Sequence, residues 1–286
     1  MQWTTTRFVL DLHRPQVMGI VNVTPDSFSD GGTHDTTKAA LLHCETLLRD
    51  GADILDIGGE STRPGAVPLS LAQELARVLP VVREAVRLGA PVSVDSYKPK
   101  VMQAVLDLGA DIINDIWALR WREPDAVAGE PDAMAVVSRH VGCGVCLMHM
   151  HREPRSMQLE PMAGDVVPQV RQFLAHPAQM LRSRGVKKER IVIDPGIGFG
   201  KTVAQNFALL ARQRELLTLG YPLLVGWSRK SSLAAMGGSA ETLAAQQRMV
   251  PSVAAALLAV ERGASVVRVH DVRETVQALR VLGALE

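Results

Sequence analysis

Short apolar runs alternate along the chain with longer stretches in which apolar residues recur at helical spacing. The apolar runs predict eight β-strands, over residues 17–23, 54–57, 92–94, 112–114, 145–148, 191–194, 223–225 and 266–269. Helices are expected between and after them, over residues 36–49, 71–87, 99–108, 132–139, 166–184, 204–219, 242–262 and 274–282. This eightfold repeat of strand and helix predicts a parallel sheet.

Eight strand–helix units can close such a sheet into an α/β barrel of the (β/α)8 or TIM type, with extended βα loops at its C-terminal face. The 286 residues fit one barrel domain over residues 1–286, since this fold takes roughly 250 residues. Residues 1–15 precede the first strand and are expected to form an N-terminal hairpin. A doubly wound open sheet is the structural alternative.

Composition indicates an ordinary globular protein and disfavours several classes of partner. Hydrophobic residues make up 47 % and charged residues 21 % of the sequence, so a large core is available. The 31 basic and 30 acidic residues leave a formal charge of +1, which provides no field for binding nucleic acid or an anionic membrane. No apolar run reaches the roughly 18 residues of a spanning helix. Three cysteines are too few for a secreted disulfide framework, and we expect a cytoplasmic protein.

Polar residues follow each of the predicted strands. They are Asn22, Asp56, Glu60, Asp95, Asn114, Asp115, His149, His151, Asp194, Ser228, Arg229, Lys230, Arg268, His270 and Asp271. For any one of them, a helix cap or a solvated loop is the simpler interpretation. In a barrel, however, all of them would converge on the C-terminal face, where βα loops build active sites. The full circuit therefore predicts one polar pocket.

Two groups of basic residues predict an anion site. Arg63 lies in a glycine-rich loop after the second strand, where backbone N–H groups suit a phosphate or carboxylate, although a solvated arginine is the alternative. The loops after the seventh and eighth strands are the usual phosphate site of barrels. Lys230, Arg268 and His270 could therefore share one anion with Asn22. A Schiff-base nucleophile at Lys230 is the competing hypothesis.

Residues 194–201 (DPGIGFGK) look like a nucleotide-binding loop but match neither common pattern. A Walker A loop needs glycine where Pro195 stands, and a dinucleotide loop needs glycine where Lys201 stands. What remains is a carboxylate, Asp194, followed by a backbone that a ligand can approach closely. Because a buried carboxylate needs a partner, the adjacent amino and N–H donors of a 2-aminopyrimidinone edge would suit it.

Cys143 and Cys146, with His149 and His151 downstream, suggest a zinc cluster. A single C-x-x-C pair that leads into a strand, without a second pair, is more often two buried thiols. A Ser-His-Asp triad is disfavoured because the sequence has no G-x-S-x-G turn. Neither cluster provides a convincing catalytic centre.

Together, eight segments resemble the successive motifs of the dihydropteroate synthase family, among the pterin-binding barrels. They are residues 23–32 (VTPDSFSDGG), 56–65 (DIGGESTRPG), 93–98 (SVDSYK), 113–115 (IND), 147–150 (LMHM), 194–201 (DPGIGFGK), 228–231 (SRKS) and 268–271 (RVHD). The segments occur in the family's order, and the resemblance spans residues 17–282. It is therefore a resemblance of nearly the whole chain.

The resemblance implies a homodimeric enzyme of folate biosynthesis, with sulfonamides as mimics of one substrate. Such an enzyme joins 6-hydroxymethyl-7,8-dihydropterin diphosphate to 4-aminobenzoate and releases diphosphate with Mg²⁺. The implied pterin-binding residues are Asp95, Asn114, Met148, Asp194, Gly226 and Lys230, and the implied diphosphate-binding residues are Asn22, Thr62, Arg63, Arg268 and His270. Asn22 is also the implied metal ligand. Phe28, Thr62, Arg63, Pro64, Phe199 and Ser231 would form the 4-aminobenzoate pocket, and catalytic roles are expected for Asn22, Asp30, Arg63, Lys230, Arg268 and His270.

Two other pterin-binding proteins remain as alternatives, a barrel methyltransferase and an inactive binding partner of a folate enzyme. The segments STRPGA and SRKS favour the synthase, because a methyltransferase needs no diphosphate site. The chain departs from the family pattern at Trp117, Trp121 and residues 123–131, and at Pro251, where glycine is common. These departures concern loop shape and the dimer surface. We expect diphosphate to leave before the amine attacks, since the dihydropterin ring can delocalise a methylene cation.

Overall fold

Parallel strands form a closed barrel in the computed structural model, which describes residues 1–24, 33–61, 66–123, 127, 129–237 and 242–285. The barrel strands are β3 (Gln16–Asn22), β4 (Ile54–Gly58), β5 (Val92–Asp95), β6 (Ile112–Asp115), β7 (Gly144–Met148), β8 (Ile191–Asp194), β9 (Leu223–Val225) and β10 (Ala264–Val269). β10 pairs in parallel with both β9 and β3 and so closes the ring. The predicted (β/α)8 barrel is confirmed, and the open sheet is excluded.

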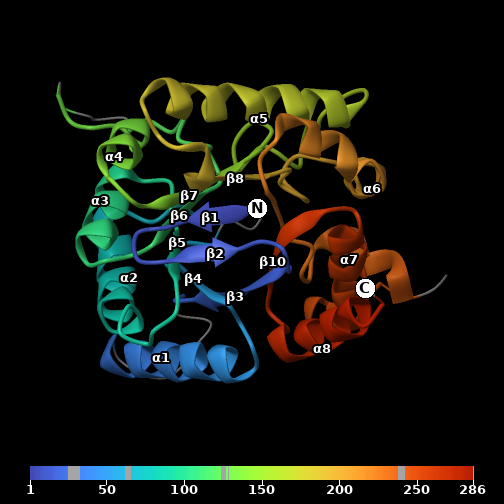
Figure 1. Ribbon diagram of the computed structural model, residues 1–286, viewed down its shortest axis with the longest axis horizontal. Helices are drawn as coiled ribbons and strands as arrows, with labels where there is room; N and C mark the ends of the chain where they lie inside the picture. The colour runs from blue at the N-terminus through green and yellow to red at the C-terminus, as the bar shows by residue number, and fades with distance from the viewer. Residues whose placement is uncertain (25–32, 62–65, 124–126, 128, 238–241, 286) are drawn as a thin grey trace.

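Helices surround the barrel on the outside (Figure 1). They are α1 (Thr33–Arg49), α2 (Leu71–Ala85), α3 (Pro99–Asp107), α4 (Ala133–Arg139), α5 (Val166–Ser183), α6 (Val203–Ala211), α7 (Met249–Glu261) and α8 (Val272–Gly283), with 3-10 helices η2 (Lys188–Arg190), η3 (Gln213–Leu219), η4 (Ser231–Gly237) and η5 (Ala245–Arg248). In the described part of the chain, no helix has the length and apolar character needed to span a bilayer.

Two helix predictions were too long, over residues 204–219 and 242–262. The first region divides at Arg212 into α6 and η3, and the second begins as η5 before α7 starts at Met249. Apolar spacing does not separate an α-helix from a short 3-10 helix, because both bury one stripe. Pro251 lies in the first turn of α7, where its missing N–H removes no helical hydrogen bond.

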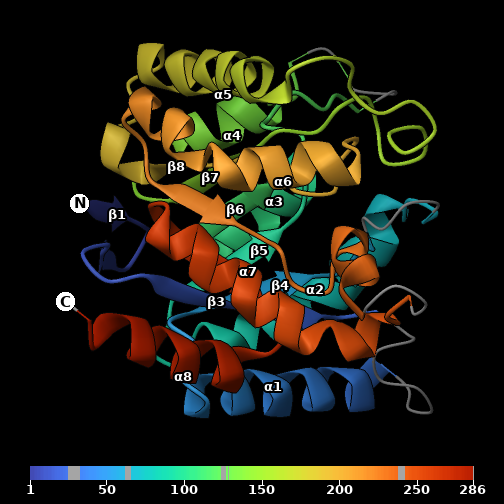
Figure 2. The same ribbon diagram turned by 90° about the vertical axis from the view of Figure 1, so that its right-hand side faces the viewer.

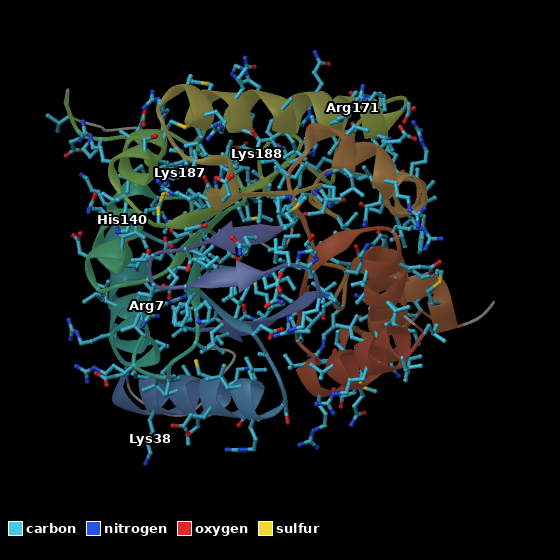
Figure 3. All side chains as sticks on the ribbon, in the orientation of Figure 1. Arg7, Lys38, His140, Arg171, Lys187 and Lys188 are labelled. Atoms are coloured by element: carbon cyan, nitrogen blue, oxygen red, sulfur yellow. The ribbon has the colours of Figure 1, made fainter. Side chains whose placement is uncertain are left out.

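An antiparallel pair, β1 (Gln2–Thr4) and β2 (Val9–Asp11), lies across the end of the barrel where the strands begin (Figures 1 and 2). Trp3 is fully buried there, and its Nε1 donates a hydrogen bond to the carbonyl oxygen of Arg190 at 3.1 Å. Arg7 reaches sideways toward α2 (Figure 3) and forms a 2.5 Å ion pair with Asp111. This end is therefore covered, which leaves the opposite end for the site.

One apolar layer fills the barrel interior. It consists of Met18, Ile54, Ile112, Cys146, Val192, Leu224 and Val266, with Trp3 and Leu12 packed below it. Successive side chains of a strand alternate between faces, so the residue two positions later also points inward, one layer nearer the C-terminal end. Cys146 is thus a packing residue. In the described residues, no group of three or more His, Cys, Asp or Glu side chains could hold a metal, which argues against the zinc cluster.

Candidate active site

A polar layer lies directly above the apolar one. Its polar side chains are Asp56, Asp95, Asn114, Asp194 and Arg268, with Met148 and Gly226 at the same level. All of them follow a residue of the apolar layer by two positions except Asp95, which follows the buried Ser93. Strand register also places Asn22, Gly58, Asp95 and Asn114 in one row across β3 to β6. The barrel therefore brings together residues that lie far apart in the sequence, at the end where the predicted pocket was expected.

Arg268 is the centre of this layer. Its Nε donates to Asp56 Oδ2 at 2.6 Å, and its Nη2 donates to Asp95 Oδ2 at 2.8 Å. Asn114 Nδ2 donates to the same Asp56 oxygen at 3.2 Å. Burial raises the pKa of Asp95 to about 7, although the nearby Arg268 charge acts in the opposite direction. Burial also disfavours the Arg268 charge, but the two carboxylates outweigh it and hold the pKa of Arg268 above its ordinary value.

Asp56 is the member of this group to which the sequence assigned no specific role. It is fully buried, and its Oδ1 has no hydrogen-bond partner in the described structure. A signal was available, because Asp56 is a single carboxylate within the otherwise apolar strand 54–57 and shares its inward face with Ile54. The simpler helix-cap interpretation obscured it.

Asp194 lies at the end of β8 and begins the glycine-rich loop. Its Oδ1 accepts a 2.7 Å hydrogen bond from the backbone N–H of Gly196, and burial raises its pKa to about 6. Gly196 has a φ of 66°, and an added Cβ would lie 1.9 Å from the carbonyl oxygen of His149. Only glycine fits this position, since both the dihedral angle and the close approach exclude a side chain.

Lys201 stabilises this loop by binding its backbone carbonyl groups. It is also the residue that gives the loop its false similarity to a phosphate-binding loop. Its buried Nζ donates to the carbonyl oxygens of Gly196 at 2.8 Å and Phe199 at 3.1 Å. Asn206 Oδ1 accepts a hydrogen bond from the N–H of Gly198 at 2.9 Å. Burial lowers the pKa of Lys201 to about 7. The loop is therefore shaped before a ligand arrives.

The loop after β9 brings Lys230 to the same pocket. Lys230 Nζ lies 4.3 Å from the centre of the Phe199 ring, so a predicted pterin residue and a predicted aminobenzoate residue are in contact. The preceding residue, Arg229, has a left-handed φ of 58°. Its backbone N–H donates to Ser252 Oγ at 2.9 Å, and its guanidinium pairs with Asp271 at 2.6 Å. These bonds offset the cost of the unusual backbone and orient the next residue.

Some of the remaining predicted site residues are described by the structure, and others lie outside its described residues. Ser228 Oγ lies 2.9 Å from Nδ1 of His270, which links the ends of the seventh and eighth units. Ser231 is the exposed first residue of η4. Phe28, Asp30, Thr62, Arg63 and Pro64 lie outside the described residues.

The fold and site define the class, a (β/α)8 barrel with buried carboxylates and one arginine above its apolar core. The chain belongs to the family of pterin-binding enzymes, which matches residues 18–270. Within this family it belongs to the dihydropteroate synthases. The dihydropteroate synthase of Neisseria meningitidis serogroup B is 45 % identical over 288 residues, which cover 99 % of this chain and 97 % of the relative.

Two solved structures support the same placement. Dihydropteroate synthase of Burkholderia cenocepacia, complexed with 7,8-dihydropteroate, is 48 % identical, with a TM-score of 0.85 over 99 % of this chain and 96 % of that one. The Yersinia pestis enzyme in a sulfonamide drug complex is 43 % identical, with a TM-score of 0.89 over 100 % of this chain and 99 % of that one. The similarity therefore includes the whole barrel.

The raised pKa of Asp194 predicts how stability depends on pH. Because the folded pKa of about 6 exceeds the unfolded value of roughly 4, the folded chain binds the proton more tightly. This contribution is fully present below pH of about 4 and is lost as the pH rises through about 6. Asp194→Asn removes it, so the wild-type stability should fall relative to the variant as pH rises from 4.5 to 7. Urea unfolding at several pH values measures the difference, and a constant difference would contradict the raised pKa.

Proposed function

We propose that this chain condenses 6-hydroxymethyl-7,8-dihydropterin diphosphate with 4-aminobenzoate, and that diphosphate departs before the amine attacks. The observation that carries the mechanism is the layer of buried carboxyl groups around Arg268. The Burkholderia cenocepacia relative binds 7,8-dihydropteroate, the product of this condensation, and the Yersinia pestis relative binds a sulfonamide. The substrate pair is extended to this chain from these relatives.

The pterin is proposed to bind against the polar layer. Asp194 is buried and accepts only one backbone hydrogen bond at Oδ1 among those described, so its carboxylate can pair with the pterin's amino and ring N–H donors. Lys230, whose side chain lies beside Gly198 of the glycine-rich loop, would donate to the ring carbonyl and a ring nitrogen. Asp95, Asn114, Met148 and Gly226 complete this pocket in the proposal. A fixed, buried set of donors and acceptors gives selectivity for one heterocyclic edge.

The diphosphate is proposed to lie at the rim, against Arg268, His270, Asn22 and the second loop with Thr62 and Arg63. Two nitrogens of Arg268 are bound by carboxylates, which orients its guanidinium, while Nη1 forms neither of these bonds. The ring of His270 is oriented by Ser228. Neutralising the charge that develops on diphosphate makes it a better leaving group.

Mg²⁺ fits this site only together with diphosphate. In the described residues no acidic or histidine cluster could hold a metal, and Asn22 offers one neutral amide oxygen at the end of β3. When bound, Mg²⁺ would neutralise charge on the diphosphate oxygens. Asn22 would orient that complex, whose other ligands would be phosphate and water.

Departure of diphosphate first is favoured by the charge of the polar layer. Asp56 and Asp95 both pair with Arg268, and Asp194 also acts on Arg268 electrostatically. Ionised carboxyl groups would stabilise a cation that develops beside them. The electron-rich dihydropterin ring can delocalise the methylene cation, so no strong general base is needed.

The amine is proposed to attack from a pocket formed by the loops. Phe199, which contacts Lys230, and Ser231 belong to its described part, and Phe28, Thr62, Arg63 and Pro64 complete it in the proposal. Catalytic roles are proposed for Asn22, Asp30, Arg63, Lys230, Arg268 and His270. The arylamine is already a free base near neutral pH, so these loops mainly position it and exclude water.

Incubation of the chain with the pterin diphosphate, Mg²⁺ and 4-aminobenzoate, followed by mass detection of dihydropteroate, tests the reaction. Absence of product would overturn it, and transfer of a methyl group without diphosphate release would indicate the methyltransferase. Substrate labelled with oxygen-18 at the oxygen that joins the methylene carbon to the diphosphate tests the order of steps. If diphosphate departs first, we expect this label to move into the nonbridging positions of the same phosphate group when 4-aminobenzoate is omitted. A label that stays at the joining oxygen of unreacted substrate during slow turnover would favour direct displacement.

Asp194→Asn and Arg63→Ala should separate the two halves of the site. The first change points an NH₂ donor at the pterin's donors and removes a charge-assisted pair, worth on the order of 1.5–3 kcal/mol. Pterin affinity should fall about tenfold or more, since roughly 1.4 kcal/mol corresponds to a factor of ten. Arg63→Ala should retain pterin binding and lose turnover. Calorimetry with a non-hydrolysable pterin ligand measures the pterin affinity of each variant, and steady-state kinetics measure its turnover. An equal loss of pterin affinity in the two variants would contradict a site with separable halves.

Metal binding should depend on diphosphate, because Asn22 alone is a weak ligand. Calorimetric titration of Mg²⁺ into the chain without substrate should show no tight site, and added diphosphate should create one. Asn22→Ala should weaken that second binding event while leaving the first titration unchanged. Tight Mg²⁺ binding by the chain alone would contradict this placement of the metal.

We also propose that the chain forms a homodimer whose interface includes part of α7 and α8. We further propose that it is located in the cytoplasm, where reducing conditions keep the three buried cysteines as thiols. Val250, Ala254 and Leu258 of α7 follow one another at four-residue spacing and are exposed, and Val281 of α8 is exposed on the adjoining helix. Burying these apolar side chains would stabilise an association. Light scattering should give a dimer that Val250→Glu with Leu258→Glu converts to a monomer, and a wild-type monomer would contradict this.

A further inference from the structure

A buried ionic cluster lies beside the second loop, outside the polar layer. Lys98, which precedes α3, places its Nζ 2.5 Å from Glu60 Oε2 and 2.5 Å from Glu74 Oε2. The side chains of Lys98, Glu60 and Glu74 are only 5 %, 8 % and 1 % exposed. Three different segments therefore meet at one ammonium group: the chain after β4, helix α2 and the chain after β5.

Glu60 connects this cluster to both ends of the second loop. Its Oε2 accepts a 2.9 Å hydrogen bond from the backbone N–H of Leu69, nine residues further along the chain. Its Oε1 accepts a 2.8 Å hydrogen bond from the hydroxyl of Tyr97. Arg77 of α2 donates to the carbonyl oxygen of Gly59 at 2.9 Å. The residues that enter and leave the loop are thus bound to each other and to the barrel rim.

Tyr97 extends the connection to Trp121, one of the positions expected to depart from the family pattern. Its ring lies edge-on against Trp121, with ring centres 5.1 Å apart. The Lys98 ammonium lies 4.8 Å from the centre of the same Tyr97 ring. The Tyr97 hydroxyl that binds Glu60 is therefore oriented by packing on one side and by the cluster on the other.

Stability alone is a weak reason for this cluster. Two buried carboxylates and one ammonium lose their hydration, and replacing such groups by apolar residues of similar volume is often neutral or stabilising. What the charges provide is geometry, because Glu60 can bind Lys98, Tyr97 and Leu69 only in one orientation. One of these bonds ends on the backbone of the loop, at the N–H of Leu69.

We propose that Lys98, acting through Glu60, is a positioning residue for the second loop and controls the affinity for 4-aminobenzoate but not for the pterin. The loop between Glu60 and Leu69 carries Thr62, Arg63 and Pro64, so the inference rests on the proposed role of that loop. Lys98 forms no described hydrogen bond to the polar layer, and Asp194 and Lys230, which would bind the pterin edge, follow β8 and β9. Loosening the loop base should therefore leave binding of the bare pterin ring unchanged.

Glu60→Gln and Glu74→Gln form a matched pair that tests this inference. Each removes one carboxylate from Lys98, but only Glu60 also binds the loop backbone. Glu60→Gln and Lys98→Met should raise the KM for 4-aminobenzoate tenfold or more and change the calorimetric Kd of a pterin ligand without diphosphate less than twofold. Glu74→Gln should change the KM less than threefold, because the bond from Lys98 to Glu60 remains.

Equal effects of Glu60→Gln and Glu74→Gln on KM would overturn the inference, as would parallel losses of pterin affinity. Thermal unfolding of each variant identifies any that fails to fold. If Lys98→Met fails, the comparison of the two glutamine variants still decides the question. Failure of the proposed reaction is distinguishable, because in that case the wild-type chain itself forms no dihydropteroate.

Discussion

The guanidinium of Arg268 is shared by two carboxylates that burial would otherwise make too costly to keep. Asp56 is on β4, Asp95 on β5 and Arg268 on β10, so the ion pairs join strands on both sides of β3. Removing the cation would leave two acidic groups unpaired, and removing either acid would leave the arginine free to turn. Because Asn114 also binds Asp56, one interaction orients four side chains before any ligand is present. The candidate site is preorganised in this sense, because these hydrogen bonds orient its side chains.

The two ends of the barrel perform different tasks. The end covered by β1 and β2 carries an apolar layer sealed by Trp3, and burial of this layer contributes to stability. The opposite end carries the polar layer, in which burial raises the pKa values of Asp95 and Asp194. Burial of charged side chains is costly in the polar layer, whereas burial of apolar side chains is favourable in the layer beneath it. The two layers are separated by only two residues along a strand.

Much of the site was predictable because its residues end strands. Asp95, Asn114, Asp194 and Arg268 were expected at the C-terminal face, and the barrel places them there at the ends of β5, β6, β8 and β10. Asp56, Lys201 and Lys98 were not assigned roles, for different reasons. Asp56 was confused with a helix cap, Lys201 with a residue of a failed nucleotide motif, and Lys98 with part of a family signature. Each acts through partners from other segments, Asp56 with Arg268, Lys201 with His149 and Lys98 with Glu60. Sequence spacing carries no information about such pairs.

The amino-acid sequence by itself determined the number and order of the strands, the barrel they form and the end at which polar residues gather. These follow from local rules, since alternation along a strand and glycine after a helix act within a few residues. Only the tertiary structure decided which charges pair and which groups titrate abnormally. Arg268 and Asp56 are separated by 212 positions yet lie 2.6 Å apart. The strength of their interaction depends on burial by all the surrounding strands, a property of the closed barrel that no single segment possesses.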